Sequence, residues 1–210
     1  MIQSWPALII GSLLLAYWAR VLRMAYKLRR RSKIELGANF IPPEPLGRLL
    51  RLMWIPLVVG WIILPLLVAF RDRLPSFLRP LVQWPIFSWI AVILAAAAFA
   101  ATWICWKRMG KSWRMGINPA EKTELVVSGP YAFVRHPIYG LSSVLMLATL
   151  SAVPSAAMIL VALVHLPLLQ WEAHREEKYL VQLHGRAYLD YAARTGRFIP
   201  IRWRRRAVET

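Results

Sequence analysis

Arg135 and His136 stand directly in front of a long apolar run, inside the stretch ELVVSGPYAFVRHPIYG at residues 124–140. A pair of carboxylates, Glu176 and Glu177, follows the same run. Ionisable side chains are costly to place at the edge of an apolar environment, so such groups indicate a binding or catalytic site. Side chains of these types make ionic contacts and charge-assisted hydrogen bonds. The sequence therefore predicts a polar site at the edge of the apolar run.

A polar stripe on the helix expected before the carboxylate pair belongs to the same site. His165, Glu172 and Glu176 fall within about 40° of one another at 100° per residue, so they share one face, which is expected to look into the protein. For His165, a structural hydrogen bond to a carbonyl freed by Pro167 competes with a functional role, and the structural interpretation is favoured. A solvated helix start is the alternative for Glu176 and Glu177.

The composition is typical of a membrane protein. The 210 residues are 58% hydrophobic and include 11 tryptophans. A net charge of +17 could suit nucleic acid, but the Lys and Arg residues lie between apolar spans, which disfavours nucleic acid and favours contact with anionic lipid. Cys105 is the only cysteine, so the sequence offers no disulfide and no cysteine-based metal site, and no metal is expected.

Five apolar segments are expected to cross the bilayer as helices, since about 20 residues are enough for one crossing. The apolar run 138–171 would be about 51 Å long as one helix at 1.5 Å per residue, so it is predicted to fold back at VPSAA, residues 153–157, into two rather short helices. No linker separates domains, so residues 1–210 are predicted to form one all-α membrane domain. The expected spans are 4–26, 49–70, 81–106, 139–153 and 155–171.

The distribution of Lys and Arg orients the five spans. Segments 20–51, 107–135 and 175–210 hold nine, six and nine of these residues, whereas segment 71–79 holds three and the hairpin tip none. Basic residues accumulate in cytoplasmic loops. We therefore expect an N-terminus outside, and a polar loop and C-terminus in the cytoplasm, with a bacterial inner membrane as the location.

The polar loop and the C-terminal segment resemble the superfamily of isoprenylcysteine carboxyl methyltransferases and phospholipid N-methyltransferases. The loop pattern SGPYxxxRHPxY occurs at residues 128–139, and EExxL…xGxxYxxYxxR…P follows at residues 176–200. The preceding GKSWRMG at residues 110–116 is similar to bacterial members. The resemblance covers about residues 107–200 and rests on the joint order and spacing of the motifs, whereas the N-terminal spans carry no such signature.

This resemblance implies a methyltransferase whose cytosolic loop and C-terminal helix bind S-adenosylmethionine. Aromatic faces and carboxylates attract a sulfonium cation, which agrees with the residue types present. The glycine-rich turn of soluble nucleotide-binding folds is missing from the sequence. Arg135 and His136 would then lie where a water-soluble donor meets a lipid-soluble acceptor. The residues implied for the cofactor are Thr123, Glu124, Leu125, Val126, Tyr131, His136, Pro137, Ile138, Tyr139 and Glu176.

The acceptor is left open. The eukaryotic prenylcysteine methyltransferases place an arginine where this sequence has Glu172, and one carboxylate does not hold another at neutral pH. Farnesylcysteine is therefore expected to be a poor acceptor that Glu172→Arg would improve. Carboxyl methylation with help from another arginine, an amine acceptor such as an aminophospholipid, and a lipophilic thiol or hydroxyl all remain. The acceptor-site candidates are Glu172, Arg135, Arg194, Arg197, His165 and Glu177.

Two further classes of protein are considered. Membrane sterol reductases share a related C-terminal architecture with an Arg–His pair and bind a nicotinamide cofactor, but they usually have more spans. A non-catalytic relative would keep only the scaffold, and the retention of both motifs disfavours it. Saturable binding of S-adenosylmethionine would distinguish the methyltransferase from both.

Overall fold

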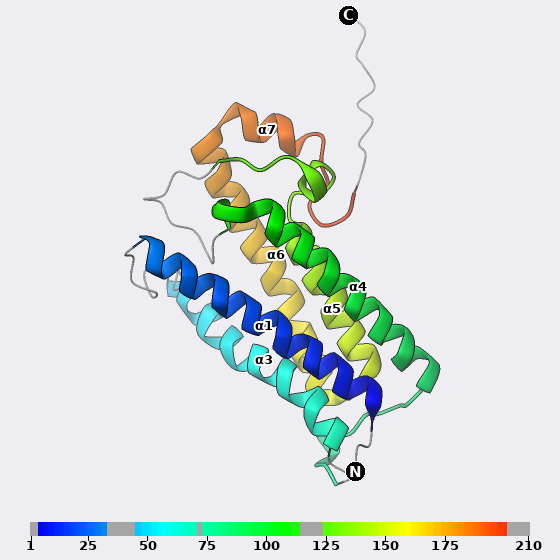
Figure 1. Cartoon of the computed structure of the whole chain (residues 1–210). Coiled ribbons are helices and arrows are strands. Elements are labelled where there is room, and N and C mark those ends of the chain that lie inside the picture. Colours follow the sequence, from blue (N-terminus) through cyan, green and yellow to red (C-terminus); the bar gives the residue numbers. More distant parts are fainter. Residues whose placement is uncertain (1–3, 33–44, 71–72, 114–123, 201–210) are drawn as a thin grey trace, which may run out of the picture.

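The computed structural model describes residues 4–32, 45–70, 73–113 and 124–200. Within these ranges there is no β-strand beyond one isolated bridge. The fold is therefore all-α, as predicted. Figure 1 shows the α-helices of these ranges, which are α1 (Trp5–Ser32), α3 (Pro45–Phe70), α4 (Pro85–Met109), α5 (Pro137–Ala152), α6 (Ala156–His184) and α7 (Arg186–Ala192).

Four helices of the described part, α1, α3, α4 and α6, are long and apolar enough to cross a membrane, which makes this a membrane protein. The remaining predicted span corresponds to α5, an apolar helix of only 16 residues. At 1.5 Å per residue α5 is about 24 Å long, which is shorter than the hydrocarbon layer of a bilayer. The third predicted span begins at Pro85 rather than at residue 81.

The prediction of a short helix over residues 155–171 is wrong, because α6 continues without a break to His184. The segment 172–184 contains neither Gly nor Pro and consists largely of good helix formers such as Glu, Lys, Leu and Gln. Gly185 then ends the helix with a φ of +53°, a conformation that residues with a Cβ rarely adopt. The extra turns of α6 carry its carboxylates to the end of the bundle where the polar loop lies.

Small and aromatic residues form the core of the bundle. Helices α4 and α5 make its most extensive contact. Ala91, Ala95 and Ala98 of α4 are buried, and small side chains of this kind let membrane helices approach closely. Trp61 of α3 is fully buried, and its indole N–H donates a hydrogen bond to Thr149 Oγ1 of α5 over 3.0 Å.

The connections between helices lie at the two ends of the bundle (Figure 1). One end holds the loop 124–136, helix α7 and residues 193–200, beside the end of α1 and the end of α4. The other end holds the start of α1, the segment 73–84 and the turn 153–155. This sorting matches the alternation of basic and less basic segments in the sequence, and which end faces the cytoplasm stays a prediction.

Residues 194–200, which we call the C-terminal strap, return from α7 to the loop in front of α5. Val134 and Gly196 form a parallel bridge, and the Arg135 N–H donates to the Gly196 carbonyl over 2.8 Å. The next N–H, that of His136, donates to a strap carbonyl over 2.9 Å. The strap thus fixes the backbone of Arg135 and His136.

A close approach between α5 and the strap explains Gly140. A Cβ atom at Gly140 would lie 2.8 Å from the carbonyl oxygen of Phe198, a distance that real Cβ atoms do not show. The neighbouring atom belongs to the backbone, so it cannot rotate away. The strap can therefore pack this closely against α5 only because residue 140 is glycine.

Candidate functional site

A cavity of about 140 Å³ opens at the end of the bundle that carries α7, and we call it the outer cavity. Its walls come from the end of α4, the loop before α5, the first turn of α5, the last third of α6, and α7. Thr123 lies outside the described residues, and cofactor binding by the others stays a prediction. The other residues implied for the cofactor all line this cavity, namely Glu124, Leu125, Val126, Tyr131, His136, Pro137, Ile138, Tyr139 and Glu176.

The loop is held in place around Tyr131. A 3₁₀ turn over Gly129–Ala132 presents this side chain, which is 4% exposed. The Tyr191 hydroxyl of α7 donates to the Tyr131 carbonyl over 2.7 Å, and the Tyr131 hydroxyl donates to Met109 Sδ of α4 over 3.4 Å. Burial raises the pKa of Tyr191 to about 12, so its hydroxyl keeps the donated proton at neutral pH. Tyr131 is thus fixed by both its backbone and its side chain.

His136 lies between the two carboxylates of α6. Its Nδ1 is 3.5 Å from Glu176 Oε2, and its Nε2 is 3.4 Å from Glu177 Oε1. Burial lowers the pKa of His136, but the two nearby carboxylates together outweigh burial, so the pKa lies above its usual 6.5. The surroundings therefore stabilise the protonated ring more than water does.

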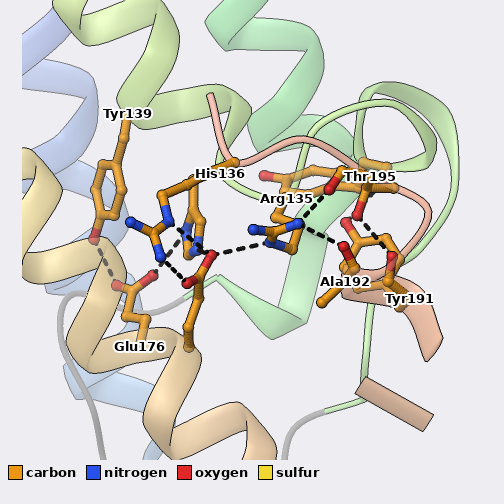
Figure 2. Close-up of polar contacts among 10 residues, drawn as sticks. Arg135, His136, Tyr139, Glu176, Tyr191, Ala192 and Thr195 are labelled. Carbon is orange, nitrogen blue, oxygen red and sulfur yellow. Dashed lines mark hydrogen bonds and ion pairs between the residues drawn. The ribbon is translucent and has the colours of Figure 1, made fainter. Parts of the chain in front are cut away.

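Tyr139 completes this group. Its ring stacks on His136 with centroids 5.6 Å apart and an angle of 9° between the planes. Its hydroxyl donates to Glu176 Oε1 over 2.5 Å, as Figure 2 shows. One carboxylate from α6, one phenol from α5 and the imidazole of the residue before α5 are thus brought together on one wall of the outer cavity.

Arg135, Glu177 and Arg197, which the sequence analysis placed among the acceptor-site candidates, bind one another and the backbone. The Arg135 Nε donates to Glu177 Oε1 over 3.0 Å, and its Nη1 donates to the carbonyl oxygens of Ala192 and Thr195 (Figure 2). Arg197 donates to the same carboxylate over 3.1 and 2.5 Å. These contacts hold α7 and the strap onto α6, and Arg135 also lines the outer cavity, so acceptor contact by these residues stays a prediction.

A second cavity, of about 110 Å³, lies deeper in the bundle, and we call it the inner cavity. Helices α1, α3, α5 and α6 and the end of α4 contribute to its walls. Most of the lining is apolar or aromatic, from Tyr17, Trp18, Val21, Leu50, Trp54, Trp106, Trp113, Ile138, Leu168 and Leu169. Such a lining suits a lipophilic group.

His165 reaches the inner cavity with both ring nitrogens occupied. The Trp54 indole N–H donates to His165 Nδ1 over 3.1 Å, and Ser142 Oγ lies 3.4 Å from Nε2. An Nδ1 that accepts a hydrogen bond carries no proton, so the ring is the neutral Nε2–H tautomer. This pairing agrees with the structural interpretation of His165, although the partner is an indole rather than a carbonyl freed by Pro167.

Glu172 also lines the inner cavity, and its negative charge is taken up by two guanidinium groups. Arg51 Nη2 of α3 lies 2.5 Å from Glu172 Oε1, and Arg175 Nη1 lies 3.1 Å from Oε2. All three side chains are 10–14% exposed. Sequence reasoning missed Arg51, although Arg51, Trp54 and Trp61 recur at spacings that place them on one face of α3.

The two cavities share a wall. Trp113, Ile138 and Tyr139 line both of them, so a ligand in either cavity would lie beside these side chains. Arg194 lines neither cavity, since its side chain is exposed and its Nε donates to the Asp190 carbonyl over 3.1 Å. The site therefore consists of two adjoining cavities with three lining residues in common.

Comparisons with known proteins locate a family within this chain. None of the curated proteins compared with it matches. A profile of the isoprenylcysteine carboxyl methyltransferase family matches residues 89–182, which include most of α4, all of α5 and nearly all of α6. This segment carries the loop and the carboxylates of the outer cavity. Residues 89–182 therefore belong to the isoprenylcysteine carboxyl methyltransferase family.

Proposed function

We propose that this protein transfers a methyl group from S-adenosylmethionine, bound in the outer cavity, to a lipophilic acceptor bound in the inner cavity. The observation that carries the proposal is the wall of Trp113, Ile138 and Tyr139 common to the two cavities. One cavity opens beside the polar loop and the other lies between apolar helices. A water-soluble donor could thus enter from the aqueous side and a membrane-soluble acceptor from the bilayer, and the two would meet at this wall.

The residues of the outer cavity fit this donor. S-Adenosylmethionine, when bound, supplies a methyl group already activated on a sulfonium ion. The Glu176 carboxylate and the faces of Tyr131 and Tyr139 attract a positive charge. His136 Nε2 is buried without a hydrogen-bond partner in the described part of the chain, because its contact with Glu177 lacks hydrogen-bond geometry, so it is available to a polar group of a ligand.

The contribution of the chain to the reaction is alignment and exclusion of water. A displacement at an activated methyl group needs the two reactants in line and in contact, and holding them so replaces a costly encounter in solution. Tyr139 is fixed by Glu176 and His136, and Trp113 and Ile138 present apolar surface at the same wall. These residues would keep water from the point where the two ligands meet.

The charges around Glu172 change the expectation for the acceptor. An isolated carboxylate would repel an anionic acceptor, but Glu172 is paired with both Arg51 and Arg175, so its negative charge is compensated. Guanidinium groups beside an apolar cavity suit an acceptor that combines an apolar chain with a carboxylate. We therefore propose carboxyl methylation, and we rank an amine acceptor below it because a cationic head group would meet these guanidinium groups.

The membrane orientation is part of the proposal. The end of the bundle that carries α7 and the outer cavity is also the end near the Lys- and Arg-rich segments, which favours its placement in the cytoplasm. S-Adenosylmethionine is a cytoplasmic metabolite, so the donor would reach the outer cavity from that side. A bacterial inner membrane remains the expected location.

Binding of the product S-adenosylhomocysteine tests the proposal directly. We expect saturable binding to the full-length protein in lipid nanodiscs by titration calorimetry. Glu176→Gln should weaken it at least about tenfold, since hydrogen bonds to charged groups contribute about 1.5–3 kcal/mol. Lys178→Ala is the control, because Lys178 is exposed on the same helix two residues away. A wild-type protein without saturable binding would refute the proposed function.

Turnover identifies the acceptor. The wild-type protein is given S-adenosylmethionine with a tritiated methyl group and, in parallel, a farnesylcysteine analogue, phosphatidylethanolamine and a lipophilic thiol. We expect label in the carboxylate acceptor. Label in phosphatidylethanolamine or the thiol alone would show that the acceptor class is wrong while leaving methyl transfer in place.

A further inference from the structure

Tyr188 of α7 has a buried hydroxyl group that the protein itself does not use. The side chain lines the outer cavity and is 2% exposed. Its hydroxyl oxygen has no hydrogen-bond partner among the described residues. A buried polar group without a partner costs folding free energy, and in a native protein such a group calls for an explanation.

The other tyrosines around the outer cavity show that this is unusual. Tyr131 donates to Met109 Sδ, Tyr139 donates to Glu176, and Tyr191 donates to the Tyr131 carbonyl. Each of those hydroxyl groups fixes one wall of the cavity to another. Of the four phenols, Tyr188 alone has a hydroxyl left without a partner in the described chain.

The ring of Tyr188 is nevertheless held firmly. It packs edge-on against Tyr191 with centroids 6.0 Å apart and an interplanar angle of 66°. Burial, followed by the negative charge of Glu177, raises the pKa of Tyr188, so the phenol stays protonated and can both donate and accept a hydrogen bond. A rigid ring with an unused polar end is a preorganised ligand contact.

We propose that the Tyr188 hydroxyl hydrogen-bonds a polar group of the bound methyl donor, which makes α7 part of the donor site. This inference rests on the proposed function. The reactive methyl group has to lie near Ile138 and Tyr139, because they form the wall shared with the inner cavity. Tyr188 comes instead from α7, beyond the bundle (Figure 1), so its partner is a polar group of the donor away from the methyl group.

Tyr188→Phe and Tyr191→Phe form a matched pair that tests the inference. Both remove one hydroxyl from α7, but only the Tyr191 hydroxyl has a partner within the protein. In the unliganded protein, Tyr191→Phe should lower the thermal midpoint, whereas Tyr188→Phe should leave it unchanged or raise it. Tyr188→Phe should weaken S-adenosylhomocysteine binding about three- to tenfold, the usual effect of one neutral hydrogen bond.

Kinetics give a second reading of Tyr188→Phe. A contact away from the reacting atoms raises the KM for the donor and leaves kcat at saturating donor unchanged. Wild-type affinity in Tyr188→Phe would overturn the inference. A fall in the unliganded midpoint as large as that of Tyr191→Phe would also overturn it, because the hydroxyl would then be bonded inside the protein or to a buried water. If the wild-type protein itself binds no S-adenosylhomocysteine, the proposed function fails first.

Discussion

Arg51→Met removes the positive charge that α3 brings to the inner cavity while keeping a side chain of similar length. Arg51 Nη2 lies 2.5 Å from Glu172 Oε1, and the two side chains are 10% and 14% exposed. At an effective dielectric constant of about 20, unit charges at that distance attract by roughly 7 kcal/mol before desolvation is subtracted. Removing one partner of a buried pair costs about 3–5 kcal/mol. Because Arg175 stays on Glu172, we expect about 2 kcal/mol of stability to be lost.

The effect on catalysis follows from the same charge. If Arg51 helps to hold an acceptor carboxylate, its loss removes a charged hydrogen bond that contributes about 1.5–3 kcal/mol, or roughly a 10- to 150-fold fall in kcat/KM. The assay uses the protein in nanodiscs at a fixed concentration of S-adenosylmethionine. It measures how tightly a farnesylcysteine analogue and its uncharged carboxamide, a competitive inhibitor, each bind. Arg51→Met should weaken the charged ligand and leave the carboxamide almost unchanged. Arg51→Lys should recover part of the loss, since it restores the charge without the planar fork.

Arg48→Met is the matched control, because Arg48 is exposed one turn earlier on α3. Glu172→Gln gives the complementary result, since removing the negative charge beside Arg51 should strengthen binding of the carboxylate. Glu172→Arg, which the sequence favoured, would instead bring a third guanidinium beside Arg51 and Arg175 and is expected to destabilise the bundle. Equal losses for the charged and uncharged ligands in Arg51→Met would refute the reasoning and leave Arg51 a purely structural residue.

Three further predictions concern the outer cavity and the topology. Because the pKa of His136 is raised in the folded state, its contribution to stability is complete below about pH 6.5 and is lost as the pH rises through the folded pKa. The thermal midpoint should therefore fall more steeply with rising pH in the wild type than in His136→Asn, and parallel profiles would contradict this. Gly140→Ala should lower both the affinity for S-adenosylhomocysteine, measured by calorimetry, and the thermal midpoint, because overpacking against the strap costs about 1–3 kcal/mol of stability. Gly60→Ala is the control, since its new Cβ atom would lie 3.7 Å from the nearest side-chain atom. In a Cys105→Ala background, an impermeant thiol reagent should label Ser76→Cys in intact cells but Arg186→Cys only after permeabilisation. Both positions are exposed, and they belong to segments at opposite ends of the bundle. The reverse labelling pattern would place the donor site outside the cell.

The local features of the site could be predicted from the sequence because they depend on residues close to one another in the chain. The uncharged run of α4 and the apolar run around α5 indicate membrane helices by length alone. The motif loop of residues 124–139 and Glu176 were predicted to gather at one end, and the structure places the described ones around a single cavity. The predicted helix ended at Trp171, where the apolar pattern ends, so the length of α6 was underestimated. The following residues are polar, but they are good helix formers and continue the helix to His184.

Only the tertiary structure decides which charges meet. Arg51 and Glu172 are 121 residues apart, and no periodicity in either segment tells that α3 lies beside α6. The sequence therefore offered no charge on α3 as a partner for Glu172, whereas the fold pairs Glu172 with both Arg51 and Arg175. The partners of Arg135 were equally hidden, because Glu177 and the carbonyls of residues 192 and 195 come near it only in the folded chain. A one-dimensional pattern records the charge of a side chain, whereas its role depends on partners that the folded chain alone brings within a few ångströms.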